Sequence, residues 1–174
     1  MHTRNVLSAV LLTIPLGLAS AVALAASAPG WMKIDAAHRT VQLDIGMGEP
    51  GTSAGFNFNG YAHGNMTVTV PVGWTVKVEA DDVDQYMPHS LEIVDAQSKP
   101  PMQALKSAFP NAETPDVTTG IKPRHKASFT FKADKAGRYW MMCGVPGHAV
   151  GGMWDKLVVS ESATTPSVSV QEAG

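Results

Sequence analysis

The sequence predicts an all-β fold, a sandwich of about seven or eight short strands. Apolar and polar residues alternate with a period of two in a series of short segments, and Pro or Gly stands between most of these segments. That period is typical of strands that bury one face, and evenly spaced short strands are typical of sandwiches and barrels. With 174 residues, 44% of them hydrophobic, we expect one domain with a sizeable core.

The first residues follow the order of a secretory signal. Arg4 precedes an apolar run over residues 6–18, and small residues follow up to Ala25. We predict a signal peptide over residues 1–25 that is cleaved after Ala25. An uncleaved membrane anchor stays open as the alternative, because residues 6–28 carry no charge and are long enough to cross a bilayer. Either way, the rest of the chain is exported, to the periplasm or the outer face of the cytoplasmic membrane.

After an N-terminal extension (residues 26–40), we predict the main domain over residues 41–160. The clearest alternation lies in MTVTVPV and WTVKVEA, residues 66–72 and 74–80. The Pro-Val-Gly of residues 71–73 predicts a bend or a change of sheet between them, because Pro cannot donate to a central ladder. The same period recurs over residues 89–94, 127–133, 138–143 and 153–159, and more weakly over 41–46 and 56–60.

Two segments break the rhythm of the strands. Residues 97–120 hold four prolines, and we expect an excursion between two core strands with one or two turns of helix over residues 102–109. Residues 161–174, ESATTPSVSVQEAG, are mostly small and polar, and they predict a disordered tail.

Cys143 is the only cysteine of the chain. Oxidising compartments use cysteines in pairs, so a lone thiol there is reactive, intermolecular or a metal ligand. His148 and Met153 follow at equal five-residue intervals in the glycine-rich stretch CGVPGHAVGGM. Strand alternation turns Cys143 and His89 toward the core, and the glycines allow the stretch to fold back. We therefore expect these four side chains to converge.

One thiolate, two imidazoles and one thioether are the ligand set of a blue-copper electron-transfer site. We predict one type 1 copper ion, cycling between Cu(I) and Cu(II), with His89, Cys143 and His148 in the trigonal plane and Met153 as the weak axial ligand. Soft sulfur suits Cu(I), and imidazole is acceptable to both oxidation states. Each residue alone also fits an ordinary structural role, but the equal spacing of the only Cys, a His and a Met favours the metal.

These motifs resemble the cupredoxin (type 1 blue-copper) family. MPHSLEIV followed by YWMMCGVPGHAVGGMWDKLVVS carries the resemblance, and FNFNGYAHGNMTVTVPVGW makes it most similar to the sulfocyanin branch, with rusticyanin next through its Cys-x4-His-x4-Met spacing. The resemblance covers residues 41–160. It implies a Greek-key β-sandwich that binds one type 1 copper and shuttles single electrons, in sulfocyanins within a respiratory chain of acid-living microbes. Sulfocyanins commonly carry an N-terminal membrane anchor, whereas this N-terminus has a cleavable pattern.

Further residues are predicted to serve the site. Ser90, next to His89, is a candidate donor to the Cys143 sulfur, which would raise the reduction potential, and an ordinary exposed serine is the alternative. The ring of His148 is expected to emerge through an uncharged docking patch for a redox partner, made of Val145, Pro146, Ala149 and Val150.

The remaining histidines and methionines receive blander roles. His38, His63 and His125 have polar or glycine neighbours, and we expect them to be solvated, with no role assigned to His63. Met87 and the neighbouring Met141 and Met142 are expected to pack around the site.

Composition and donor set exclude several function classes. A net charge of -2 with only 16% charged residues excludes a polybasic surface for nucleic acid. A Cys-His hydrolase needs a free nucleophile, a copper oxidase brings further His clusters, a binuclear copper centre needs two Cys, and zinc rarely takes Met. We therefore expect no enzyme but a monomeric electron carrier with redox partners such as a cytochrome or terminal oxidase, associated with the membrane only if its N-terminus anchors it. A copper-delivery protein is the alternative.

Overall fold

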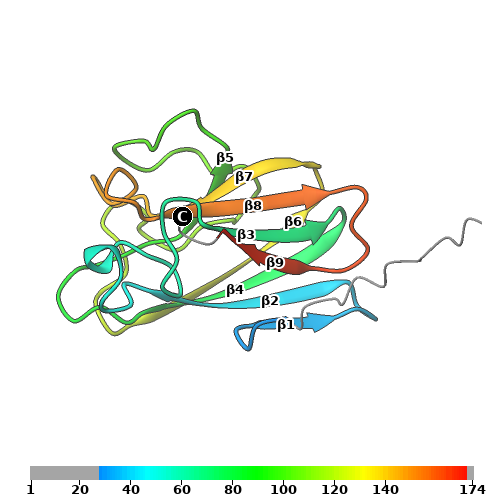
Figure 1. Cartoon of the computed structure of the whole chain (residues 1–174), viewed down its shortest axis with the longest axis horizontal. Helices are drawn as coiled ribbons and strands as arrows, with labels where there is room; N and C mark the ends of the chain where they lie inside the picture. The colour runs from blue at the N-terminus through cyan, green and yellow to red at the C-terminus, as the bar shows by residue number, and fades with distance from the viewer. Residues whose placement is uncertain (1–27, 172–174) are drawn as a thin grey trace, which may run out of the picture.

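The structure is a computed structural model that describes residues 28–171. Its strands form two β-sheets (Figure 1). One sheet has the order β1-β2-β4-β6 and the other the order β5-β7-β8-β3-β9. The predicted signal peptide lies outside the described residues. The strands are β1 (Met32–Asp35), β2 (Thr40–Met47), β3 (Met66–Pro71), β4 (Trp74–Asp82), β5 (Glu92–Asp95), β6 (Lys126–Ala133), β7 (Gly137–Met142), β8 (Trp154–Ser160) and β9 (Ser167–Val170).

Alternating burial explains why these segments form strands. Every second side chain is buried along β2, β4 and β8. The main core lies between the two sheets, because each sheet contributes its apolar face to a single cluster. This cluster includes Leu43, Ile45, Val68, Val76, Val78, Ile93, Phe131, Met141, Leu157 and Val159.

The chain changes sheets where the Pro-Val-Gly turn was predicted. β3 pairs in parallel with β8 in one sheet, whereas β4 pairs in parallel with β2 in the other. Between β3 and β4, Gly73 has a φ of +82°, a left-handed conformation that favours glycine. This confirms the change of sheet, and the two parallel pairings give the sandwich its crossed connections.

Three sequence expectations about secondary structure are corrected by the fold. Residues 56–60 form no strand: Phe58 makes only isolated bridges to Met47 and Tyr61, since Asn59 and Gly60 turn the chain with positive φ. Residues 89–94 pair regularly only from Glu92 onward. The expected disordered tail over residues 161–174 instead contains β9, which pairs antiparallel with β3.

The excursion over residues 97–120 contains no helix at residues 102–109. Over residues 102–109, the backbone N–H groups of Ala104 and Ala108 donate to neighbouring segments and not to the preceding turn. The Ala108 N–H donates to the Ile93 carbonyl (2.8 Å), and the Ile93 N–H donates to the Ala112 carbonyl (2.9 Å). These bonds pair the backbone N–H and C=O groups of Ile93 on the outer edge of β5. This tertiary pairing overrides the weak helix propensity of residues 102–109. The excursion therefore covers an otherwise open sheet edge.

β1 and β9 both lie outside the core strands that the sequence marked most clearly. β1 belongs to the predicted N-terminal extension, yet it pairs antiparallel with β2 from Met32 to Asp35. Three of its four side chains are exposed, as are three of the four in β9. Edge strands of this kind bury little and so leave a weak alternation in the sequence.

Candidate metal centre

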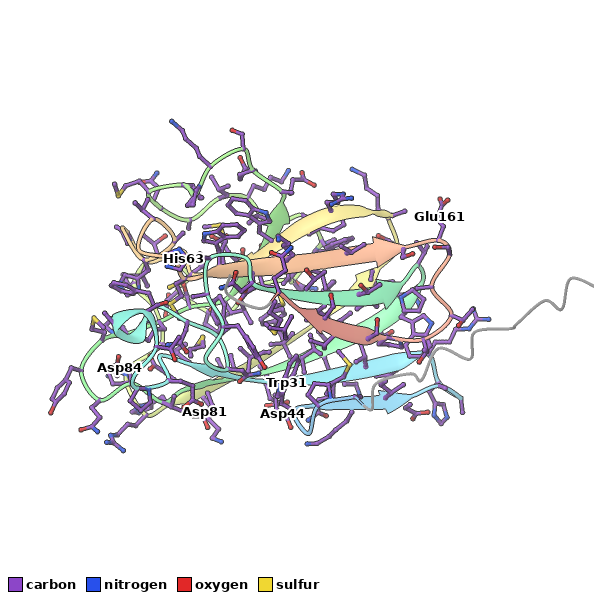
Figure 2. All side chains as sticks on the ribbon, viewed as in Figure 1. Trp31, Asp44, His63, Asp81, Asp84 and Glu161 are labelled. Carbon is purple, nitrogen blue, oxygen red and sulfur yellow. The ribbon has the colours of Figure 1, made fainter. Side chains whose placement is uncertain are left out.

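Two segments bring the predicted ligands to one end of the sandwich. We call residues 82–89, which run from the last residue of β4 to His89, the acidic segment. We call residues 143–153, which connect β7 to β8, the ligand loop. Asp84 of the acidic segment and His63, whose N–H donates to the carbonyl of Gly152 in the ligand loop, lie at this end, whereas Glu161 lies at the opposite end (Figure 2).

Backbone hydrogen bonds fold the ligand loop back on itself. The Cys143 N–H donates to the Met153 carbonyl (3.0 Å), and the Met153 N–H donates to the His148 carbonyl (3.0 Å). Gly147, with a φ of +87°, allows the tight turn before His148. The loop thus returns to its starting point, as its glycine content predicts.

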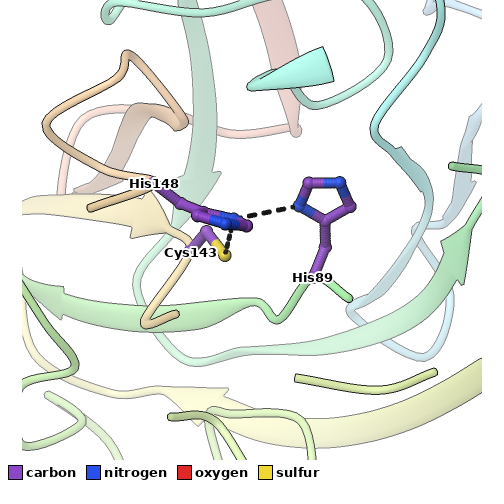
Figure 3. A group of neighbouring side chains, drawn as sticks. All are labelled: His89, Cys143 and His148. Atoms are coloured by element: carbon purple, nitrogen blue, oxygen red, sulfur yellow. Dashed lines mark hydrogen bonds between the residues drawn. The ribbon is translucent and has the colours of Figure 1, made fainter. Parts of the chain in front are cut away.

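Three of the four predicted ligands present their donor atoms to one point (Figure 3). The His148 Nδ1 lies 3.5 Å from the Cys143 Sγ and 3.2 Å from the His89 Nδ1. One ligand atom from each residue lies within 4.8 Å of the others. Donor atoms that share one small ion at about 2 Å are about 3–4 Å apart, so the cluster fits a single metal ion.

Burial favours the neutral form of both imidazoles. His89 is fully buried, and this lowers its pKa below the ordinary value although Asp84 opposes the shift. Burial and the neighbouring His89 lower the pKa of His148 to about 4. A neutral ring offers a nitrogen lone pair, which is the form that ligates metals. Burial also raises the pKa of the Cys143 thiol, with the Ser90 N–H opposing this.

Met153 closes the ligand loop from a fully buried position in the main core. Its backbone is fixed on both sides by the hydrogen bonds to Cys143 and His148. The assignment of its thioether as axial ligand rests on spacing and chemistry and stays a prediction.

Ser90 contacts the Cys143 sulfur mainly through its backbone. Its N–H donates to the sulfur at 3.4 Å, while its hydroxyl oxygen lies 3.6 Å from the sulfur. The hydroxyl donates to the Val117 carbonyl (2.7 Å) and accepts from the Gly144 N–H (3.0 Å). Ser90 is completely buried, so the alternative of an ordinary exposed serine is excluded.

The predicted docking patch is corrected at one residue. Val150 is 51% exposed and Pro146 is exposed, but Ala149 is 1% exposed because it packs with Val94, Trp140 and Met142 on the outer face of the sheet. Met102 lies beside the patch, since its carbonyl accepts the Gly147 N–H (2.7 Å) and the residue is 63% exposed. The apolar surface therefore extends onto the excursion.

Sequence reasoning overlooked the carboxylates of the acidic segment. The fully buried Asp82 accepts the backbone N–H of His89 (2.8 Å) and that of Asp84 (3.1 Å). Asp84 in turn contacts the ring of His89 at Nε2. The sequence DDVDQYMPH carried a signal for them, because three aspartates just before a predicted buried ligand are unusual for a strand end.

The other histidines of residues 28–171 are not part of the cluster, although His63 lies beside the ligand loop at Gly152. His38, His63 and His125 are exposed, as predicted.

Among residues 28–171, no helix has the length and apolarity needed to cross a membrane.

The chain is similar in sequence to known proteins. Residues 27–170 match the family described as the sulfocyanin (SoxE) domain. The sulfocyanin of Sulfolobus acidocaldarius is 29% identical over 147 residues, covering 74% of this chain and 68% of that protein. The rusticyanin of Acidithiobacillus ferrooxidans is 32% identical over 101 residues, covering 55% of this chain and 61% of the rusticyanin.

Solved structures share the fold. Reduced rusticyanin superposes with a TM-score of 0.53 at 23% identity, covering 74% of this chain and 88% of that one. Auracyanin A of Chloroflexus aurantiacus, described as a "blue" copper protein, gives a TM-score of 0.50 at 21% identity, covering 70% and 99%. These similarities confirm the predicted cupredoxin-like Greek-key sandwich.

Proposed function

The chain belongs to the sulfocyanin family, and from that premise we propose that it carries single electrons between redox partners outside the cytoplasmic membrane, in a respiratory chain. The observation that supports this most is the convergence of the His89, Cys143 and His148 donor atoms on one point. The cofactor is one type 1 copper ion, which the cluster fits. His89, Cys143, His148 and Met153 would hold it, the first three through converging donor atoms and Met153 through its thioether.

The protein contributes a set of ligands that is largely buried and fixed in position. When bound, copper accepts and returns one electron by alternating between Cu(II) and Cu(I), which prefer different geometries. Cys143 and His89 are completely buried. Cys143 directly follows strand β7, and the backbone hydrogen bonds of the ligand loop fix the positions of Cys143, His148 and Met153. Ligands that cannot move impose one compromise geometry on both oxidation states, so little reorganises during transfer.

The proposed route for electrons runs through His148. This residue is half-buried, and the neighbouring ligand-loop residues Val145, Pro146 and Val150 carry no charge. An uncharged apolar patch suits a brief, weak contact with a redox protein such as a cytochrome or terminal oxidase. The proposed export to the periplasm or outer membrane face rests on the sequence of residues 1–25.

A copper-delivery protein is the second candidate. Its metal would have to leave readily, so its ligands are expected to be exposed and exchangeable. The complete burial of His89, Cys143 and Met153 favours retention of the ion instead.

Protein-film voltammetry with a Cu(I) chelator present separates the two functions. An electron carrier gives a reversible one-electron wave whose amplitude survives incubation with a mild Cu(I) chelator. Loss of the wave together with transfer of copper to the chelator would instead identify a delivery protein.

A further inference from the structure

We propose that Asp84 is the positioning residue for His89: its carboxylate accepts the Nε2–H of the ring and thereby leaves Nδ1 to face the metal. The inference deepens the proposed function and rests on it for the identity of the metal. Its geometric basis is independent, because it concerns contacts among residues of the chain itself.

The two nitrogens of the His89 ring face different groups. Nε2 lies 3.5 Å from the Asp84 Oδ2, whereas Nδ1 lies 3.2 Å from the Nδ1 of His148, in the cluster with Cys143. A neutral imidazole carries one N–H and one lone pair. Because a carboxylate only accepts hydrogen bonds, the proton belongs on Nε2, and the lone pair on Nδ1 is then free to ligate a metal.

Asp84 is itself held in place through its other oxygen. Oδ1 accepts the backbone N–H of Tyr86 (2.7 Å) and that of Met87 (3.0 Å). Burial would raise the pKa of Asp84, but these two bonds and the contact with His89 together hold it below the ordinary value. The carboxylate therefore uses one oxygen to fix itself and aims the other at His89.

Close backbone packing confines this contact. The Asp84 side chain is only 12% exposed and the His89 side chain 0%. A Cβ atom built on Gly48 would lie 2.7 Å from the His89 Nε2, and one built on Gly55 would lie 3.1 Å from the Asp84 Oδ2. Glycine backbone therefore packs closely against the Nε2 side of the ring and against the Oδ2 of the carboxylate, which are the two atoms that face each other.

Because the two oxygens of Asp84 have different partners, the isosteric variant Asp84→Asn tests their roles. The amide has a single oxygen. If that oxygen keeps the N–H groups of Tyr86 and Met87, the amide NH₂ faces the ring and favours the tautomer with its proton on Nδ1. A purely structural aspartate that only shapes the segment would tolerate the change, since its two backbone bonds survive.

The matched control is Asp35→Asn. Asp35 accepts the His38 N–H through Oδ1 (3.1 Å) and contacts the His38 ring through Oδ2 (2.7 Å), far from the ligands in an exposed turn. It repeats the same aspartate-histidine chemistry without a metal site. Any effect of a general loss of such a pair therefore appears in both variants.

The readout is the tautomer of His89 in long-range ¹H–¹⁵N NMR spectra, recorded on the Cu(I) protein and on the copper-free chain. Wild type is expected to show the proton on Nε2 in both forms. Asp84→Asn is expected to lose this signature and to bind Cu(II) roughly 10- to 100-fold more weakly, whereas Asp35→Asn binds within about twofold of wild type.

A proton on Nδ1 in the wild-type copper-free chain overturns the proposal even if the variant does not fold. Unchanged tautomer and Cu(II) affinity in a folded Asp84→Asn variant overturn it as well. Failure of the proposed function looks different: the wild-type chain then binds no copper, while the copper-free spectrum still reports the tautomer.

Discussion

The two segments that supply the ligands are held by different chemistry. The acidic segment fixes His89 with carboxylates: Asp82 holds its backbone and Asp84 its ring. The ligand loop contains no charged residue, and its own backbone bonds hold Cys143, His148 and Met153. The two carboxylates that hold His89 are buried or nearly so. The side that we propose meets a partner is neutral.

The difference has a physical reason. A carboxylate that accepts several N–H groups fixes a short segment firmly but needs burial to avoid competition from water. A docking surface has to shed water quickly, and charged groups oppose this.

The largest expected effect is that of Gly48→Ala, on the acidic side. Gly48 has a φ of +80°, and a Cβ there would lie 2.7 Å from the His89 Nε2 and 2.9 Å from the Asp84 Cβ. We expect a loss of roughly 3–4 kcal/mol in the free energy of unfolding, from backbone strain plus overpacking, together with weakened copper binding. Chemical denaturation and metal titration measure both.

Gly51→Ala is the control for that variant. Gly51 has a φ of +88° but no atom within 4 Å of its would-be Cβ. It therefore incurs only the strain, about 1–2 kcal/mol, and leaves copper binding unchanged. Equal effects of the two substitutions would contradict the tight enclosure of His89.

A second prediction concerns pH and Glu92, a buried carboxyl that packs against Gly144 of the ligand loop. Glu92 is fully buried, accepts the Leu105 N–H (3.2 Å), and would lie 2.9 Å from a Cβ on Gly144. Burial raises its pKa from 4.5 to about 7. The folded state thus holds this proton more tightly, and the stabilisation present below pH 4.5 is lost as pH rises toward 7.

The loss amounts to about 2–3 kcal/mol in the free energy of unfolding. Glu92→Gln should remove that part of the pH dependence in urea denaturation series, while the exposed Glu161→Gln should leave it intact. The same pH dependence between pH 4.5 and 7 in wild type and Glu92→Gln would refute the assignment.

The third prediction tests the neutral surface with Val150→Asp. Val150 is 51% exposed on the ligand loop, and a charge there has to be desolvated at the contact. We expect electron transfer to the protein partner to slow about tenfold, with the absorption spectrum unchanged. Val72→Asp, in the turn between β3 and β4, adds the same charge at the opposite end and should have no effect. Equal slowing with small inorganic reductants would argue against a docking role.

The smallest expected effect is that of Ser90→Ala on the reduction potential. The backbone N–H that donates to the Cys143 sulfur remains, and the hydroxyl gives its proton to the Val117 carbonyl, so only the effect of a hydroxyl dipole 3.6 Å from the sulfur is lost. This effect is smaller than that of one hydrogen bond, ~1 kcal/mol, and we expect the potential to fall by no more than a few tens of millivolts. Cyclic voltammetry measures this decrease, and an unchanged potential would dismiss the role of the hydroxyl.

The sequence predicted those parts of the molecule that a local pattern encodes. Strands with one buried face, such as β4 and β8, show a clear alternation of apolar and polar residues. The residue types of the ligand loop, one Cys, one His and one Met, indicate a copper site by themselves. The convergence of Cys143 and His148 needed only a short glycine-rich loop. His89 required the added argument that strand alternation turns it inward.

Features that depend on partners distant in sequence escaped prediction. β9 is too short and polar to be recognised without β3 beside it. The excursion has a local preference for helix at residues 102–109, but pairing with β5 decides its backbone. Ala149 sits on the ligand loop, yet its burial depends on Trp140 and Met142. Asp84 gains its role only because the chain turns back and places its carboxylate against a ring five residues later.

The measurement that tests the central claim most directly is the absorption spectrum of the copper-loaded protein beside that of Cys143→Ser. If Cys143 and the two histidines hold one type 1 copper, the wild-type protein shows an intense band toward the red end of the visible spectrum, and the variant lacks it. A wild-type protein that binds one copper ion without this band, or a variant that keeps it, would contradict the account.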